Sequence, residues 1–237
     1  MDKWFEDKFR KENIREPASK HLRRNLNFGF FNFSITTNLI IINVVAFFVF
    51  TLLLAFKVIP IDFVAIKPSN IFAGKYLWTF LTSMFMHGGF FHLFANMLSL
   101  FFIGSLVEKI LGKKRYIYFY LISGLLASLF FVLSSLIFTA DINSYAVGAS
   151  GALFGVIGLL VLLTPNLPVY VMFIPIPIKM KYAAPGLLIV LWLISIAGDI
   201  PIGNTAHLGG LLAGLGYGFY LRKKYKNKTN YIRKHFS

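Results

Sequence analysis

Long apolar stretches follow one another along the chain after a polar beginning, and short polar or proline-containing segments separate them. A helix needs about 20 apolar residues to cross the hydrocarbon core of a membrane. Only helices and closed barrels satisfy their backbone hydrogen bonds in lipid, and these stretches are too long for barrel strands. The pattern therefore predicts an all-α polytopic membrane protein with six transmembrane helices, at roughly 35–56, 90–107, 116–138, 147–163, 182–197 and 205–220.

The connection at residues 57–89 differs from an ordinary solvated loop. It contains Pro60 and Pro68, which would break a span, but it is rich in apolar side chains. Tyr and Trp are enriched at membrane–water interfaces, so Tyr76 and Trp78 are expected at the level of the headgroups. The segment is therefore predicted to be a membrane-associated first loop that lies in the interface or half enters the bilayer.

Three parts are expected along the chain: a polar cytoplasmic N-terminal segment at 1–33, a six-helix membrane domain at 34–222 and a basic cytoplasmic tail at 223–237. The first part is not expected to be a cleavable signal peptide, because no small-residue cleavage site follows a short apolar region. Its five acidic residues also argue against a transit peptide.

Lysine and arginine are distributed unevenly between the connections. Eight precede the first span, and 3, 4, 0, 2, 0 and 7 follow the successive spans, so alternate connections together hold 21 and 3. Because positively charged residues collect on the cytoplasmic side, both termini are predicted to be cytoplasmic. The second, fourth and sixth spans then run from the outer face inward, in a multi-pass protein of the cell membrane.

The composition agrees with this fold class. Hydrophobic residues make up 57% of the chain, charged residues 14%, and the mean hydropathy is +0.70, whereas a soluble domain carries about 25% charged residues. The net charge of +15 is interpreted as charge that sets topology and touches anionic headgroups, and no nucleic-acid partner is expected. The absence of cysteine excludes disulfides and thiolate chemistry.

Polar clusters stand at the beginning of three alternate spans. His92 and Asn96 open the second span, Ser150 the fourth and His207 the sixth. At a rise of 1.5 Å per residue, each cluster lies about 18–22 Å from the inner end of its helix. Polar groups are costly at this depth, so three of them at one level indicate a shared site in the outer half of the bilayer.

Glycine spacing predicts how two of these helices meet. Gly210 and Gly214 lie on the same face as His207, and Gly151 begins a glycine stripe beside Ser150. Small residues four apart let helices approach closely in membranes. The stripes on the fourth and sixth spans are expected to bring serine and histidine together, with the Phe154 ring stacked on the imidazole. The full stripes are Gly151, Gly155 and Gly158, and Gly210, Gly214 and Gly218.

These residue types fit nucleophilic catalysis. A serine hydroxyl needs a base to take its proton, and neutral histidine is the usual base. No carboxylate lies inside an apolar run, so the sequence predicts a Ser150–His207 dyad without the customary third residue. His92, Asn96 and backbone N–H groups at the beginning of the fourth span would stabilise the oxyanion.

Structural explanations stay open beside this hypothesis. A serine in a membrane helix often only packs, a lone histidine often bonds across an interface, and His92 with Asn96 would also form a polar clasp between helices. A metal site is not expected, because His87 and His92 are five residues apart and no His-Glu-x-x-His motif occurs. The Gly-x-Ser-x-Gly elbow of soluble hydrolases is only half matched, since Ala152 replaces its second glycine.

Three motifs together resemble the rhomboid family of intramembrane serine proteases, over roughly residues 35–222. They are His87-Gly-Gly-Phe-Phe-His92-Leu-Phe-Ala-Asn96, Gly148-Ala-Ser150-Gly151 and Ala206-His207-Leu-Gly-Gly-Leu-Leu-Ala-Gly214. The resemblance implies a six-helix rhomboid-like bundle, catalytic Ser150 and His207, an oxyanion site with His92 and Asn96, and supporting positions at Gly148, Gly151, Phe154, Gly210 and Gly214. It implies membrane-anchored single-span substrates cut in or beside their transmembrane segment, and no metal or other cofactor.

The chain departs from the family where it has Trp78-Thr79, because the family often has Trp-Arg there. An inactive rhomboid-like protein that binds transmembrane segments is the alternative function, although the chain keeps both Ser150 and His207. A transporter is a third hypothesis. The absence of carboxylates from the apolar runs argues against it, because ionisable residues within membrane spans typically mark transport pathways. The Gly198–Gly203 turn is expected to act as a movable cap over His207.

Overall fold

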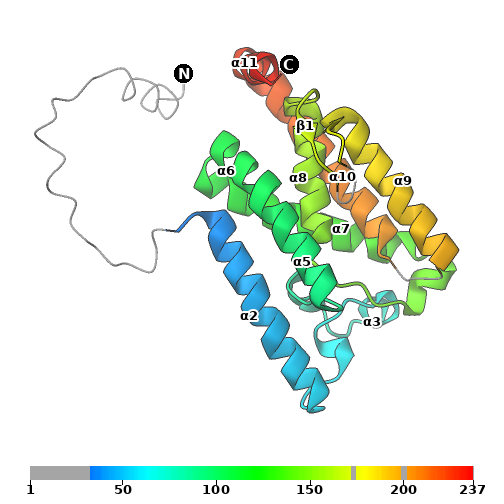
Figure 1. The fold of residues 1–237 in the computed structure, drawn as a ribbon. Coiled ribbons are helices and arrows are strands. Elements are labelled where there is room, and N and C mark those ends of the chain that lie inside the picture. Colours follow the sequence, from blue (N-terminus) through cyan, green and yellow to red (C-terminus); the bar gives the residue numbers. More distant parts are fainter. Residues whose placement is uncertain (1–32, 172–174, 199–201, 237) are drawn as a thin grey trace, which may run out of the picture. The chain divides into compact units, whose positions relative to one another are not determined.

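The structure, a computed structural model, describes residues 33–171, 175–198 and 202–236. The predicted N-terminal segment lies outside the described residues except for Phe33, and so do the central residues 199–201 of the predicted cap. The part that the structure describes is mostly helical (Figure 1). Apart from the helices it contains a two-stranded antiparallel sheet, β1 (Pro168–Val169) with β2 (Ile178–Lys179), and an isolated bridge between Ile66 and Ala146.

Helical segments follow all six predicted spans, with small shifts at their ends. The third helix, for example, begins at Lys113 and ends at Ser134 instead of spanning 116–138. The second contains a π-helical stretch, η3, between two α-helical parts. The segments are α2 (Ile35–Ala55), α5 (Phe90–Ser99) with η3 (Leu100–Gly104) and α6 (Ser105–Leu111), α7 (Lys113–Ser134), α8 (Ser150–Leu163), α9 (Met180–Gly198) and α10 (Asn204–Lys224), and α11 (Lys226–His235) follows in the tail.

Four of these segments are long and apolar enough to cross a membrane, within the residues that the structure describes: α2, α5 to α6, α7 and α9. Helix α8 has only 14 residues, and α10 has the length but carries five glycines and several polar residues that lower its hydropathy. The chain is thus a helical multi-pass membrane protein, while the count of six spans stays a prediction.

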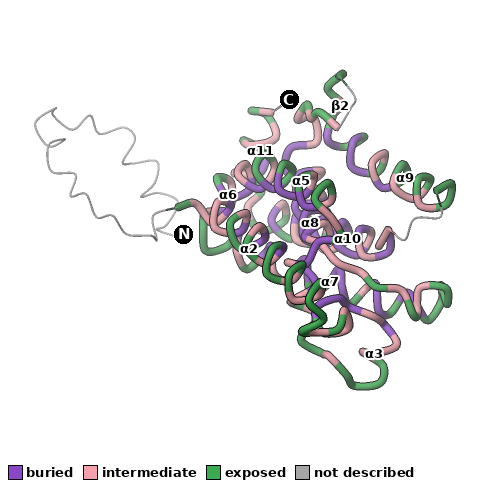
Figure 2. Tube along the Cα trace, turned by 60° about the horizontal axis from the view of Figure 1, so that its bottom comes forward, coloured by how far each residue is buried: buried purple, intermediate pink, exposed green. Residues whose placement is uncertain are grey.

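Helix α8 lies in the centre of the bundle. Ten of its fourteen residues are buried and the other four are partly buried, as the purple stretch in Figure 2 shows. Helices α10, α7 and α9 pack around it. A helix of this length is about 21 Å long, which is shorter than the hydrocarbon core of a bilayer. Its neighbours cover it on all sides, so its apolar residues serve the protein core and need not face lipid.

The contact between α8 and α10 is a contact between backbones. A Cβ atom at Gly210 would overlap the carbonyl oxygen of Gly151, and one at Gly214 would overlap that of Gly155. The glycine stripes predicted from the sequence therefore do face one another. This close approach sets the distance between the first turns of the two helices, where Ser150 and His207 lie.

The first loop contains three short helices, η2 (Ile61–Phe63), α3 (Pro68–Phe72) and α4 (Thr79–Thr82). Thr79 is buried, and its hydroxyl donates to the carbonyl of Tyr76 at 2.7 Å. The Trp78 indole N–H donates to the carbonyl of Phe63 at 2.9 Å, and the rings of Phe63, Tyr76 and Trp78 contact one another. Threonine in place of the family's arginine is thus compatible with a loop that is held by its own contacts.

Glu108 binds the beginning of helix α2, a contact that the sequence pattern does not predict. The pattern predicts that the second span ends at this residue, but α6 continues to Leu111 and the Glu108 side chain is buried. Its carboxylate accepts hydrogen bonds from the backbone N–H groups of Ile35 and Thr36, at 2.9 and 2.8 Å, and from the Thr36 hydroxyl. The first N–H groups of a helix have no partner within it, so Glu108 caps α2.

Candidate active site

Ser150 is the first residue of α8, directly after a turn that only glycine accommodates. Gly148 has a φ of +115°, in the region that L-residues rarely adopt. Its Cα also lies against the imidazole of His92, because a Cβ at this position would be 2.8 Å from His92 Nε2. The Gly148 N–H donates to the carbonyl of Ser83 in the first loop at 2.8 Å. This turn holds the Ser150 side chain beside His92 at the end of the central helix.

His207 lies in the first turn of α10 and is buried. Its Nε2 is 2.8 Å from Ser150 Oγ, which is a hydrogen-bond distance. The Phe154 ring stacks on the imidazole as the sequence predicts, with 4.6 Å between ring centroids and 21° between planes. No described residue hydrogen-bonds the other ring nitrogen, Nδ1. Packing, not a carboxylate, therefore holds the imidazole next to the serine.

His92 and Asn96 lie one turn apart on α5, and their side chains have different hydrogen-bond partners. His92 Nδ1 faces the N–H of Gly88 at 3.4 Å, a long hydrogen bond in which Nδ1 is the acceptor. In the neutral imidazole the proton is then on Nε2, which lies beside Gly148 and the serine turn. The amide of Asn96 instead donates to the carbonyl of His92 at 2.8 Å. The structure thus brings His92 to the serine, while the Asn96 amide bonds within its own helix.

His87 is a buried neighbour of this group. Its ring contacts the ring of His92 in an edge-to-face arrangement at 5.2 Å, and its Nδ1 is 3.3 Å from the carbonyl of Phe85. Burial lowers the pKa of His87 to about 4, with a further contribution from His92, so its imidazole is neutral at physiological pH. Among the described residues, no group of three or more His, Cys, Asp or Glu side chains is placed to hold a metal ion.

The chain segment before Ser150 is tied to the first loop by contacts that the sequence analysis did not find. Ile66 and Ala146 exchange two backbone hydrogen bonds, at 3.1 and 2.9 Å. The hydroxyl of Tyr145 donates to the carboxylate of Asp62 at 2.8 Å. The paired segments are about 80 residues apart in the chain, and no periodic pattern marks them.

The charge state of this link follows from its partners. The Asp62 carboxylate also accepts a hydrogen bond from Asn70, and this bond, then the Tyr145 hydroxyl and nearby Lys67, holds its pKa below the usual value. Burial and the adjacent Asp62 raise the pKa of Tyr145 to about 12. Across neutral pH Asp62 is therefore ionised and can accept the hydrogen bond, and Tyr145 is protonated and can donate it.

The arrangement has the parts of an acyl-transfer site. A serine oxygen lies within hydrogen-bond distance of an imidazole, and an N–H donor on His92 stands beside the turn that carries the serine. Each of these groups comes from a different helix, so packing of α5, α8 and α10 decides their geometry.

Comparison with known proteins gives a family match. The family model described as Rhomboid domain matches residues 74–224. RHOMBOID-like protein 1 of Arabidopsis thaliana is 42% identical over 154 residues, which are 63% of this chain and 36% of that protein. Rhomboid protein 1, mitochondrial, of Saccharomyces cerevisiae is 32% identical over 149 residues, 60% of this chain and 41% of that protein.

A further relative bears on activity. Inactive RHOMBOID-like protein 8 of Arabidopsis thaliana is 36% identical over 140 residues, 58% of this chain and 36% of that protein. The chain thus spans less than half the length of each of these three relatives. The matches support an intramembrane protease-like fold, and similarity alone does not separate active from inactive proteins.

Proposed function

Because the chain belongs to the rhomboid family, we propose that it is an intramembrane serine protease that hydrolyses peptide bonds in or near the transmembrane segments of membrane-anchored proteins. The observation that carries the proposal is the 2.8 Å distance between Ser150 Oγ and His207 Nε2. Serine becomes a useful nucleophile only with a base in hydrogen-bond contact. In an inactive protein of the same fold, no catalytic step would require a base in contact with this serine.

In the proposed mechanism, Ser150 Oγ attacks the carbonyl carbon of the scissile bond while His207 Nε2 takes the hydroxyl proton. The negative charge moves to the carbonyl oxygen, and the Nε2–H of His92 and N–H groups at the start of α8 donate to it. Collapse of this intermediate breaks the C–N bond, and His207 returns its proton to the leaving amine. Water then attacks the resulting ester with His207 again as base, which frees Ser150. Asn96 would contribute only if its amide turned away from the His92 carbonyl.

The membrane arrangement is part of the proposal. The distribution of lysine and arginine favours six spans with both termini in the cytoplasm, which places the Ser150–His207 pair in the outer half of the bilayer. Residues 34–222 would form the membrane domain, with 57–89 as its membrane-associated loop. The substrate is itself a membrane segment and would enter sideways from the lipid, while water arrives from outside. A cell-membrane location is proposed on the same charge pattern.

Labelling with a fluorophosphonate probe tests whether the serine is activated. The probe forms a covalent bond only with a serine whose proton a base can remove, so the detergent-solubilised protein is expected to be labelled. Ser150→Ala should not be labelled, and His207→Ala should lose nearly all labelling because only the base is missing. If a folded, monodisperse sample showed no labelling, the alternative, an inactive binder of transmembrane segments, would be favoured.

Tyr145→Phe tests whether the first loop positions the serine turn. The change removes the bond to Asp62 but keeps the ring and its contact with the Lys67 amine at 5.2 Å. The link is partly exposed and worth on the order of 1 kcal/mol, so cleavage of a reconstituted substrate should slow by about fivefold. The effect should be constant from about pH 6 to 9, because the lowered pKa of Asp62 means the bond is lost only when pH falls into the acid range.

Tyr118→Phe is the matched control for this substitution. Tyr118 is exposed on α7, outside the first loop and the segment before Ser150, and the substitution removes the same hydroxyl group. Its cleavage rate should equal that of the unchanged protein. Equal rates for both variants would show that the contact between Asp62 and Tyr145 does not influence the serine.

A further inference from the structure

The first turn of α10 holds polar side-chain atoms that are buried without a hydrogen-bond partner. Within the described parts of the chain, this turn contributes three such atoms, namely Asn204 Oδ1, Thr205 Oγ1 and His207 Nδ1. Asn204 is 5% exposed and His207 is 6% exposed, so bulk solvent does not solvate their polar atoms. A buried polar group without a hydrogen bond is costly, and in native proteins such a group often takes part in the chemistry of a site.

Asn204 and His207 lie on one face of α10. They are three residues apart, and the backbone N–H of His207 donates to the carbonyl of Gly203 at 3.1 Å, so the helical turn that joins them is closed. Side chains at this spacing are neighbours, and a helical side chain leans over the turn before it. The imidazole of His207 therefore leans over the turn that begins with Asn204. Thr205 precedes His207 by two residues, about 200° around the helix, and lies on another face.

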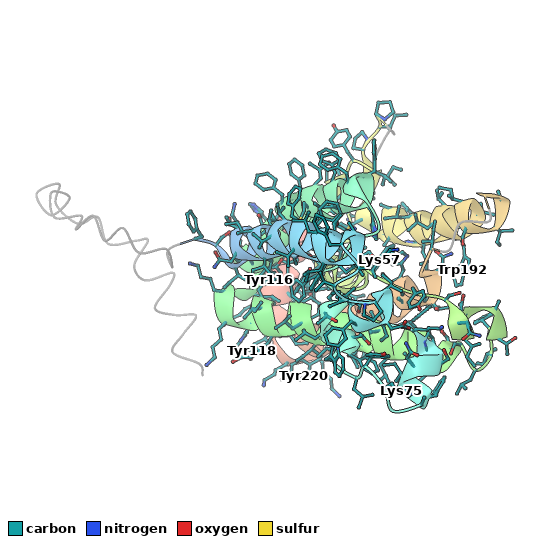
Figure 3. The ribbon with its side chains drawn as sticks, turned by 90° about the horizontal axis from the view of Figure 1, so that it is seen from below. Lys57, Lys75, Tyr116, Tyr118, Trp192 and Tyr220 are labelled. Carbon is teal, nitrogen blue, oxygen red and sulfur yellow. The ribbon has the colours of Figure 1, made fainter. Side chains whose placement is uncertain are left out.

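The two ring nitrogens of His207 differ in what they can reach. Nε2 lies at the far end of the ring and is 2.8 Å from Ser150 Oγ on α8. Nδ1 is bonded to the ring carbon that carries the Cβ stem, so it stays close to its own helix. The Phe154 ring covers a face of the imidazole and belongs to an apolar cluster with Leu188, against which Trp192 of α9 packs (Trp192 is labelled in Figure 3). These apolar side chains offer Nδ1 no acceptor, whereas the first turn of α10 does.

A catalytic base at this position needs an acceptor beside Nδ1. To take the serine proton, Nε2 of His207 must carry the free electron pair, so the proton of the neutral imidazole must be on Nδ1. Once Nε2 is protonated too, the ring is positively charged, and hydrogen bonds from charged donors are stronger than neutral ones. An acceptor at Nδ1 thus fixes the useful tautomer and stabilises the charge that forms during the reaction. The amide oxygen of an asparagine is such an acceptor.

We propose that Asn204 is a positioning residue for the Ser150–His207 pair, an inference that rests on the proposed protease function. Asn204 Oδ1 accepts the Nδ1–H of His207, and no proton passes to the amide. In the structure the two atoms do not bond, but the terminal torsion of an asparagine has a broad energy well, so its amide can turn toward the ring while the helix stays in place. Hydrogen bonds in active sites often tighten only in the complex with substrate.

Cleavage of a single-span substrate by Asn204→Leu in proteoliposomes tests the proposal, because leucine has a similar volume but no acceptor. We expect kcat to fall about tenfold, since the lost bond is one to a charged ring, and KM to stay unchanged, since Asn204 is buried away from the substrate. Asn204→Asp keeps an acceptor oxygen, and a carboxylate is favourable at the beginning of a helix. Its kcat should stay close to that of the unchanged protein. Equal slowing in both variants would overturn the proposal, because the acceptor oxygen would then not matter.

Thr205→Val is the matched control. It removes a buried hydroxyl that also lacks a partner from the same turn of α10, and it keeps the shape of the side chain. Because Thr205 lies on another face of the helix than His207, kcat should equal that of the unchanged protein. A loss as large as that in Asn204→Leu would mean that the loss of any polar group in this turn slows the reaction, and the assignment to Asn204 would be wrong.

Ser150→Ala, measured beside these variants, separates this inference from the proposed function. If the unchanged protein does not cleave the substrate, or if Ser150→Ala cleaves it equally fast, the proposed function fails and the inference fails with it. If Ser150→Ala is inactive and Asn204→Leu is as fast as the unchanged protein, only the inference fails. Should Asn204→Leu not fold, Asn204→Ala replaces it, with the same expected loss in kcat and the same criterion for rejection.

Discussion

Replacing Ser150 with alanine is expected to reduce cleavage of a single-span substrate by a factor on the order of 10⁴ or more, below detection in most assays. In the proposed mechanism the variant lacks the oxygen that forms the covalent intermediate. It should leave the helix intact, since the Ser150 side chain is half-buried and alanine is smaller. The thermal unfolding midpoint should stay within about two degrees of the unchanged protein. The measurement is product formation in proteoliposomes that contain both proteins.

The double variant Ser150→Ala/His207→Ala sharpens this prediction. Residues that act as one catalytic unit have strongly non-additive effects, so the double variant should be no slower than Ser150→Ala alone. If the two residues contributed independently, the rate reductions of the two single variants would multiply in the double variant. Residual cleavage in Ser150→Ala near the rate of the unchanged protein would show that the 2.8 Å contact between Ser150 and His207 is only structural. The cleavage would then come from another nucleophile or from a contaminating protease, and the proposed Ser150–His207 mechanism would be wrong.

The sequence predicts the serine–histidine contact because two periodic patterns intersect there. Gly210 and Gly214 lie on the His207 face of their helix, and the facing stripe lies beside Ser150, so close packing of the stripes leaves the two side chains few relative positions. Phe154 lies one turn beyond the serine on the same helix face, which is why its stacking on the imidazole could also be predicted.

Other features of the site have no local signal in the sequence. The link between Asp62 and Tyr145 joins two loops, and loop side chains carry no periodicity that would pair them. The capping role of Glu108 depends on where α2 begins in space, not on the pattern around residue 108. For Asn96 the sequence predicts either an oxyanion donor or a polar clasp between helices. The structure shows that its amide donates to the His92 carbonyl one turn away, within its own helix.

The largest expected effect on stability comes from the smallest possible substitution at the helix contact, Gly214→Ala. The new Cβ would overlap the carbonyl oxygen of Gly155 and stand 2.8 Å from the backbone nitrogen of Leu159, and neither backbone atom can turn away as a side chain would. The helices α8 and α10 must separate to admit it. Such overpacking costs about 1–3 kcal/mol, which should lower the unfolding midpoint by roughly 3–10 °C.

Separation of the helices should also reduce activity, because Gly214 lies two turns from His207 on the same face of α10. A displacement of about 1 Å between reacting groups can cost on the order of 100-fold in rate. Gly216→Ala is the control on the same helix, since nothing lies within 4 Å of the Cβ it adds. Alanine there should leave the rate unchanged and raise the unfolding midpoint slightly, because it favours helix over glycine by up to about 1 kcal/mol. If the two variants behaved alike in both measurements, α8 and α10 would not touch through their backbones, and the packing that brings Ser150 to His207 would need another explanation.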